Sequence, residues 1–265
     1  MARQVDSLTL LIQPFCSGSS GNCLFVRAGD ISILIDAGLT GDRLEEHLQS
    51  HGIAAESLAG IVLTHLHGDH LGCAGKISRR QKVTVFASDD GVKSNAVVGR
   101  LKKLSRFHPG DVLEFNQLRV FTIPISHDAP GTVACVVEYE GARFGIATDL
   151  GRASDRVAAE FYRSNGFLLE FNHSETALRD GAYPWRLKRR VLSEEGHLSN
   201  EQAAEMLQKS VGPTTKTVLL GHLSEHNNDA AWALAAARGA LATIHRNDVD
   251  VLIAPRGELG PALSF

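Results

Sequence analysis

The most informative stretch of the sequence carries four side chains of metal-ligand type within six residues. It reads THLHGDH (64–70) and directly follows a short apolar run of strand character. Residues two apart on an extended segment point to the same side, so His65 and His67 can bind one cation together. The intervening glycine permits a tight turn that would direct Asp69 and His70 to a second position beside it. The alternative interpretation, a solvated polar loop, does not explain this density of ligands.

Three further positions at the ends of expected strands offer additional ligands. His127 and His222 each follow an apolar run, and Asp149 ends another. Side chains at strand ends gather at one edge of a fold, where functional sites are commonly found. A single histidine or aspartate at such a position is more often structural. Together with the first motif, the three indicate one metal-binding set.

The elements that must position these side chains are predicted from apolar periodicity. Runs separated by turn-rich segments predict an antiparallel meander of strands at 8–12, 23–26 and 31–36. Further strands are expected at 60–65, 83–87, 119–125, 132–139, 143–149, 166–171, 216–221 and 250–254. Helices are expected at 42–52, 71–81, 153–164, 199–210 and 228–240. No repeat or linker interrupts this pattern, which predicts a single α/β domain over residues 1–265.

Composition narrows the class of protein. The chain has 265 residues, 43% of them hydrophobic and 22% charged, with a net charge of −3. These values are typical of a globular protein and argue against one that coats nucleic acid by bulk electrostatics. No apolar run reaches the roughly 18 residues that a membrane-spanning helix needs. We expect no membrane partner, and the sequence leaves the oligomeric state open.

The cysteines and the first residues of the chain bear on its location. The four cysteines form no CxxC pair, so neither a disulfide framework nor a cysteine zinc site is indicated. The opening MARQVDSLTLLIQPF carries an acid at Asp6 and no small-residue cleavage site. It predicts a first strand rather than a signal peptide. A reducing, cytoplasmic location is therefore expected.

The order of the motifs resembles the metallo-β-lactamase fold. LIDAG (34–38), THLHGDH, the segments of His127 and Asp149, and GHLSEHNN (221–228) follow one another as that fold's metal-binding motifs do. The similarity is greatest to the YycJ (WalJ) branch, which is similar to the nucleases of the superfamily. The resemblance extends from SGSSGNC (17–23) to GHLSEHNN and implies an α/β, four-layer αββα sandwich.

Carried over residue by residue, the resemblance implies a site for two cations. The first would bind three imidazoles, those of His65, His67 and His127. The second would bind one carboxylate and two imidazoles, those of Asp69, His70 and His222. Asp149 would bridge the two cations, because a carboxylate has two oxygens to share. Asp36 matches the early aspartate of the family and would orient a ligand histidine without binding metal itself.

The chemistry of such a site follows from the paired cations. Two divalent ions that share a water lower its pKa toward neutrality and give a bridging hydroxide as nucleophile. A nitrogen-rich ligand set suits Zn²⁺, while imidazole mixed with carboxylate also accommodates Mn²⁺ or Fe. Asp69, through the metal pair, is one expected catalytic residue. The other is His197, in EGHLSN (195–200).

EGHLSN runs into an expected helix and resembles the Gly-His-Ser segment of ribonuclease Z, where a histidine lies beside the scissile phosphate. His197 could then donate a hydrogen bond to a phosphoryl oxygen or protonate the leaving oxygen. The alternative is a histidine at a helix start, satisfied by the backbone. Ser199 or Asn200 is a natural N-cap for that helix.

Three segments supply candidate substrate-binding residues. In SGSSGN (17–22), small residues let backbone N–H groups approach an anion. The same residues also suit a plain turn between two strands. The candidates in this segment are Ser19, Ser20 and Asn22. The segment after the strand at 166–171 adds two polar residues that either line the site or lie on the surface, Asn172 and His173. The segment YPWRLKRR (183–190) could bind along a phosphate backbone and stack a base. Alternatively, it forms a solvated basic helix face. Its cations are Arg186, Lys188, Arg189 and Arg190. Within GHLSEHNN, His226 departs from the acidic residue expected in the YycJ branch.

The sequence thus favours a binuclear metal-dependent hydrolase, a phosphodiesterase or nuclease of exonuclease type that acts on DNA. One alternative is an ester, thioester or lactone hydrolase on the same metals, because this fold hosts several reactions. Another is a non-catalytic, metal-bound regulatory protein. The choice between DNA and RNA, the polarity, and end versus internal cleavage stay open.

Overall fold

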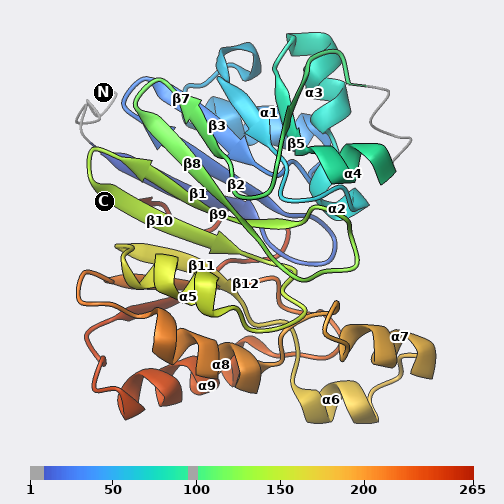
Figure 1. The fold of residues 1–265 in the computed structure, drawn as a ribbon, viewed down its shortest axis with the longest axis vertical. Helices are drawn as coiled ribbons and strands as arrows, with labels where there is room; N and C mark the ends of the chain where they lie inside the picture. The colour runs from blue at the N-terminus through green and yellow to red at the C-terminus, as the bar shows by residue number, and fades with distance from the viewer. Residues whose placement is uncertain (1–8, 95–100) are drawn as a thin grey trace.

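Two mixed sheets form the centre of the structure, a computed structural model that describes residues 9–94 and 101–265 (Figure 1). Within these residues the first sheet has the strand order β14 (Leu263–Ser264), β1 (Leu10–Cys16), β2 (Cys23–Ala28), β3 (Ile31–Ile35), β4 (Gly60–Val62), β5 (Val85–Ser88) and β6 (Leu104–Phe107). The second has the order β13 (Asp250–Ile253), β12 (Thr217–Gly221), β11 (Gly166–Glu170), β10 (Ala142–Ala147), β9 (Val133–Tyr139), β8 (Leu118–Pro124) and β7 (Val112–Phe115). Asp6 and the first residue of the strand expected at 8–12 lie outside the described residues.

Helices cover the outer face of each sheet (Figure 1). Those on the side of the first sheet are α1 (Gly41–Ser50), the 3-10 turn η1 (Ala55–Ser57), α2 (Gly68–Leu71), α3 (Ala74–Gln81) and α4 (Asp89–Ser94). Those on the side of the second are α5 (Asp155–Tyr162), α6 (Glu175–Asp180), α7 (Trp185–Val191), α8 (Asn200–Ser210) and α9 (Ala230–Thr243). In the described part of the chain, no helix is long and apolar enough to cross a bilayer.

The alternation of side chains along the strands divides the core into three clusters. On β3, Ile33 and Ile35 face the cluster between the sheets, where they join Val137 and Phe144 of the second sheet. Leu34, between them in sequence, faces the opposite way into the cluster under the helices of the first sheet. This is the two-residue period of a strand buried on both faces. A third cluster lies between the second sheet and its helices, which completes the expected four-layer αββα sandwich.

Strand direction brings many loops to one edge of the sandwich. The predicted antiparallel meander is present as β1, β2 and β3. β3 and β4 run parallel, and so do β10, β11 and β12 in the other sheet. β8 has the same direction as β10, because both pair antiparallel with β9. The loops that follow these strands therefore carry the polar motifs to a common place.

The structure differs from the sequence-based expectation mainly in short elements. Strands β6, β7 and β14 and helices α2, α4, α6 and α7 have few residues and no extended periodic pattern. The helix expected at 71–81 is divided, because α2 ends at Leu71 and α3 begins at Ala74. Gly72 separates them with φ +20°, and a Cβ at this position would lie 2.5 Å from the carbonyl oxygen of Ala37. The break lets the chain turn closely past the loop after β3.

Candidate metal centre

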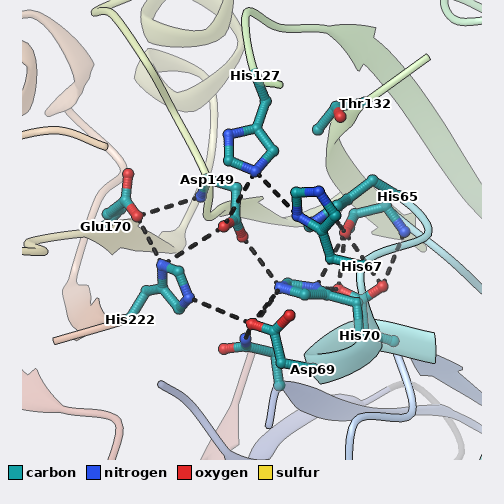
Figure 2. Close-up of polar contacts among 12 residues, drawn as sticks. His65, His67, Asp69, His70, His127, Thr132, Asp149, Glu170 and His222 are labelled. Carbon is teal, nitrogen blue, oxygen red and sulfur yellow. Dashed lines mark hydrogen bonds and ion pairs between the residues drawn. The ribbon is translucent and has the colours of Figure 1, made fainter. Parts of the chain in front are cut away.

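The carboxyl ends of strands in both sheets bring the expected ligands together (Figure 2). His65 and His67 follow β4, and Asp69 and His70 lie in the single-turn helix α2. The second sheet contributes side chains from the loops after β8, β10 and β12, those of His127, Asp149 and His222. Figure 2 shows these side chains directed toward one another around Asp149. Ligands from distant parts of the chain thus face a common centre.

The potential ligand atoms form several overlapping groups around Asp149, one of which joins Asp149 and His222 to Glu170 and His197. One atom each from His65, His67 and His127 lie within 4.8 Å of one another, and the same holds for Asp69, His70 and His222. Asp149 lies within the same distance of His65 and His70. The side chain of Asp149 is 3% exposed, and its two oxygens face different histidines. A cation in each group could share this carboxylate.

Asp36 fixes the geometry of the THLHGDH motif from the end of β3. Its Oδ2 accepts a hydrogen bond from His70 Nδ1 at 2.8 Å, and its Oδ1 accepts one from the backbone N–H of Thr64, also at 2.8 Å. This contact leaves His70 Nε2 facing Asp149 Oδ2 at 3.1 Å. A carboxylate that holds one imidazole nitrogen sets the tautomer and direction of the other. Asp36 therefore contacts the ring nitrogen of His70 that points away from Asp149.

Glu170 plays the same part on the opposite side of the centre, and the sequence reasoning did not select it. Its buried Oε1 accepts hydrogen bonds from His222 Nδ1 at 2.6 Å and His197 Nδ1 at 2.9 Å. Its Oε2 accepts the backbone N–H groups of Leu150 and Leu198. Burial raises the pKa of this carboxyl, but the two imidazoles outweigh burial and lower the pKa to about 2. The available signal was an acid at the end of the apolar strand GFLLE.

Strained backbone accompanies three of these side chains. Asp36, Asp149 and His222 have φ angles of +62°, +60° and +56°, in the left-handed region that is rare for residues other than glycine. Each is the first or second residue after a strand, where the chain turns sharply from the sheet. Such conformations cost free energy and cluster at functional sites. Here they turn three polar side chains into the same space.

The electrostatics of the centre favour cations. Burial lowers the pKa of His65 well below its ordinary value, and burial also lowers that of His127, so both imidazoles are neutral and ready to coordinate. Burial opposes the charged form of His70 too, but the carboxylates of Asp36 and Asp149 outweigh it and raise its pKa to about 10. Neutral imidazoles beside buried carboxylates form a site where a divalent cation would compensate the negative charge.

Orphaned nitrogen atoms show that a metal fits this arrangement. His65 Nε2 and His222 Nε2 are buried and have no hydrogen-bond partner among the described residues. The nearest carboxylate oxygen to the second, Asp69 Oδ2, lies 3.9 Å away. Buried polar atoms without a partner are rare in proteins and call for an explanation such as an ion. The other ring nitrogen of His65 faces Thr64 Oγ1 at 3.1 Å, so only Nε2 is free to coordinate.

A cavity of about 230 Å³ opens beside the centre. Its polar side is formed by expected ligands, among them His67, Asp69 and Asp149, and by His197. The segment between β11 and α8, which carries His197, also contributes Tyr183, Leu187, Arg190 and Val191. A substrate in this cavity would contact the metal centre and the α6–α7 segment at the same time.

The candidate residues of SGSSGN take different positions. Ser19 lines the cavity, while Ser20 is exposed and does not. Asn22 is buried, and its Nδ2 donates to the carbonyl oxygen of Gly18 at 3.0 Å and also lies 3.0 Å from His70 Nε2. The loop is thus fastened beside the metal centre by Asn22, which corrects the expectation that Asn22 presents itself to an anion.

Asn172 and His173 are both buried. Asn172 lines the cavity, and its Nδ2 donates to the carbonyl oxygen of His222 at 2.9 Å. His173 is 1% exposed and lies outside the cavity, and its ring nitrogens have no hydrogen-bond partner in the described ranges. Burial lowers the pKa of His173 to about 4. It is neither a surface residue nor a wall of the cavity, so the structure corrects both interpretations of this histidine.

Only one cation of the basic cluster lines the cavity. Arg190 does so, and its Nε donates to Asp128, whose Oδ1 lies 3.4 Å from His67 Nε2. Lys188 is buried, and its Nζ donates to the carbonyl oxygen of Arg179 at 2.6 Å, which joins α7 to α6. This corrects the expectation that Lys188 contacts a phosphate backbone. Two exposed cations lie outside the cavity, Arg186 and Arg189.

Comparison with known proteins places this geometry in a family. The profile of the metallo-beta-lactamase superfamily matches residues 17–222. The chain is 34% identical to exodeoxyribonuclease WalJ of Streptococcus pneumoniae serotype 2, over 80% of this chain and 81% of that protein. It is also 34% identical to exodeoxyribonuclease YycJ of Bacillus anthracis, with the same two coverages.

A solved structure supports the fold independently. The metallo-beta-lactamase fold protein YhfI from Bacillus subtilis superposes with a TM-score of 0.74 at 15% sequence identity. The superposition covers 97% of this chain and 100% of that one. The predicted order of motifs, the αββα layers and the sequence relatives agree. The chain is a member of the metallo-beta-lactamase superfamily and, within it, of the family of WalJ and YycJ.

Proposed function

We propose that this protein is a binuclear metal-dependent phosphodiesterase, a nuclease of exonuclease type that acts on DNA. One observation carries the proposal: two groups of three ligand atoms flank Asp149 beside a cavity that also contains His197 and Arg190. The relatives named exodeoxyribonuclease support the choice of DNA among the substrates that this fold accepts.

Two divalent ions would be held by the expected ligands. One ion would be held by His65, His67 and His127. The other would be held by Asp69, His70 and His222, and Asp149 would be shared by both. The preponderance of imidazole supports Zn²⁺, with Mn²⁺ or Fe as the alternatives. When bound, the metal pair lowers the pKa of water and stabilises the negative charge that develops on a phosphoryl group.

The residues of the chain would orient the phosphodiester and move the proton. Glu170 holds His197 Nδ1 at 2.9 Å, which leaves the other ring nitrogen of His197 to donate a proton to the leaving oxygen or a hydrogen bond to a phosphoryl oxygen. Arg190 supplies positive charge at the cavity wall, and Asp128 restrains it there. Both groups act on a substrate that the cavity has already placed.

The location and the extent of the domain belong to the same proposal. We place the protein in the cytoplasm, which the buried, free state of its cysteines supports: Cys16, Cys23, Cys73 and Cys135. We also propose that residues 1–265 form one functional domain, since residues near both ends, in β1 and β14, pair in the first sheet.

The test is digestion of end-labelled DNA and RNA by the metal-loaded protein. We expect DNA to be degraded from an end, Asp69→Ala to abolish the activity, and His197→Ala to lower it by about 100–10,000-fold. The matched controls, exposed Asp42→Ala and exposed His108→Ala, should retain activity. Turnover of thioesters or lactones without any cleavage of DNA would contradict the proposal and favour the small-molecule alternative.

A further inference from the structure

Resting on the proposed function, we infer that the α6–α7 segment builds a pocket for the base of a single nucleotide next to the scissile phosphate. Tyr183 forms the surface on which that base packs. The cavity beside the metal centre is lined by chemically different side chains, as the pocket for a nucleotide needs. The lining combines carboxylates and imidazoles with Tyr183, Leu187, Val191 and Arg190.

The cavity is open to solvent on one side, so a chain molecule can enter it with one end. Its volume of about 230 Å³ lies below the roughly 300–1,000 Å³ of pockets that enclose drug-sized ligands. A ligand that reaches the metal centre with its phosphate can therefore contact Tyr183 and Leu187 with the group next to that phosphate. An aromatic and aliphatic wall beside an arginine suits a flat base attached to a phosphate.

Tyr183, Leu187, Arg190 and Val191 lie in the α6–α7 segment, which connects β11 to α8. Figure 1 shows α6 and α7 displaced from α5, α8 and α9 toward the side of the molecule where α2 lies. The buried Nζ of Lys188 joins α7 to α6 through the carbonyl oxygen of Arg179. Arg190 joins α7 to Asp128 in the loop after β8. The wall is therefore formed before a ligand arrives, and a preformed site avoids an ordering cost on binding.

Tyr183 itself is held by a neighbour from another loop. Its half-buried ring meets the ring of His226 edge-on, with 5.8 Å between centroids and 76° between planes. His226 comes from GHLSEHNN, the segment that also carries the expected ligand His222. A contact of this kind restrains the plane of the tyrosine ring, and Tyr183 also lines the cavity beside the metal centre. Trp185, two residues away, is 61% exposed and lies outside the cavity.

The experiment compares two ligands that differ only in the base. Deoxyadenosine 5′-monophosphate and deoxyribose 5-phosphate are titrated into the metal-loaded protein by isothermal calorimetry. We expect the nucleotide to bind about 5–150-fold more tightly than the sugar phosphate, which is the range for stacking of one base. Tyr183→Ala should remove most of this ratio and leave the affinity for deoxyribose 5-phosphate unchanged. Tyr183→Phe should preserve the ratio, because the ring is kept.

Trp185→Ala is the matched control, an exposed aromatic on the same segment, and it should leave both affinities unchanged. Equal affinities of the two ligands for the wild type would overturn the inference. An equal loss of affinity for both ligands in Tyr183→Ala, together with the same loss in Tyr183→Phe, would also overturn it. That result would mean that Tyr183 has a structural role. Digestion of DNA by the same preparation reports separately on the proposed function, and the affinity ratio decides the base pocket whether or not DNA is cut.

Discussion

Three carboxylates hold imidazoles of the metal centre without belonging to the expected ligand set. Asp36 holds His70, and Glu170 holds both His222 and His197. Asp128 lies 3.4 Å from His67 and is itself restrained by an arginine. Partners of this kind fix the ring plane and increase the basicity of the ligand. At the scale of single residues, the expected ligands therefore depend on acids outside the predicted ligand set.

Glu170→Gln tests this dependence. The two carboxylate oxygens of Glu170 accept hydrogen bonds from two imidazoles and two backbone N–H groups. A glutamine keeps only one of these acceptor oxygens and replaces the other with an NH₂ group, which donates. We expect metal affinity and nuclease activity to fall by about 10–100-fold while the fold is retained. Activity assays and metal analysis after dialysis measure the two effects. Exposed Glu175→Gln is the control, and equal behaviour of the two variants would refute the role of Glu170.

At the scale of elements, the start of α8 positions the segment that carries His197. Ser199 is the N-cap, and its Oγ accepts from the backbone N–H of Gln202, whose side chain accepts in return from the backbone N–H of Ser199. Ser199 also forms an isolated parallel β-bridge with His173. A reciprocal cap fixes the direction in which the chain enters a helix. Here it fixes how His197 enters the cavity.

Ser199→Ala should remove the side-chain half of this cap. We expect the free energy of unfolding to fall by about 1 kcal/mol, the usual cost of replacing a serine N-cap with alanine. Urea unfolding followed by circular dichroism measures the loss. Glu205→Ala, an exposed substitution within the same helix, should change stability by less than about 0.5 kcal/mol. A loss no greater in Ser199→Ala than in this control would contradict the assignment of the cap.

At the scale of the whole molecule, the centre lies where the two sheets meet. His65, His67, Asp69 and His70 come from the first sheet and the short helix after it, while the other expected ligands come from loops of the second. Metal ions at this position would hold the two halves of the sandwich together. Because such ions bind the folded state and not the dispersed ligands of the unfolded chain, they stabilise the fold by mass action.

Removal of metal should therefore lower the thermal midpoint of unfolding. At a free metal concentration of about 100 times Kd, binding contributes about 2.7 kcal/mol of stability. Scanning calorimetry before and after treatment with a chelator measures the shift, and adding Zn²⁺ back should reverse it. A variant that lacks Asp149, Asp149→Asn, should show a smaller shift than the wild type. An unchanged midpoint in the chelated wild type would count against metal at this position.

The sequence by itself determined the longer strands, the order of the motifs and the candidate ligands. Apolar alternation is a local property, so β3 and β12 were recognised from their residues, and the spacing of His65, His67, Asp69 and His70 is likewise local. The short helices α6 and α7 could not be predicted from the sequence, because so few residues do not establish the 3.6-residue apolar period of a helix. Their packing depends on contacts with distant loops.

Only the tertiary structure decided which charged side chains form hydrogen bonds and ion pairs with which partners. Glu170, Lys188 and Asp128 each pair with a group far along the chain or across a helix contact, and no spacing in the sequence encodes those pairings. Burial then decides their consequence, because a charge removed from water must find a partner. The ligands could be named from residue type and order, whereas the acids that orient them and the wall that faces them arise only when the chain brings distant segments together.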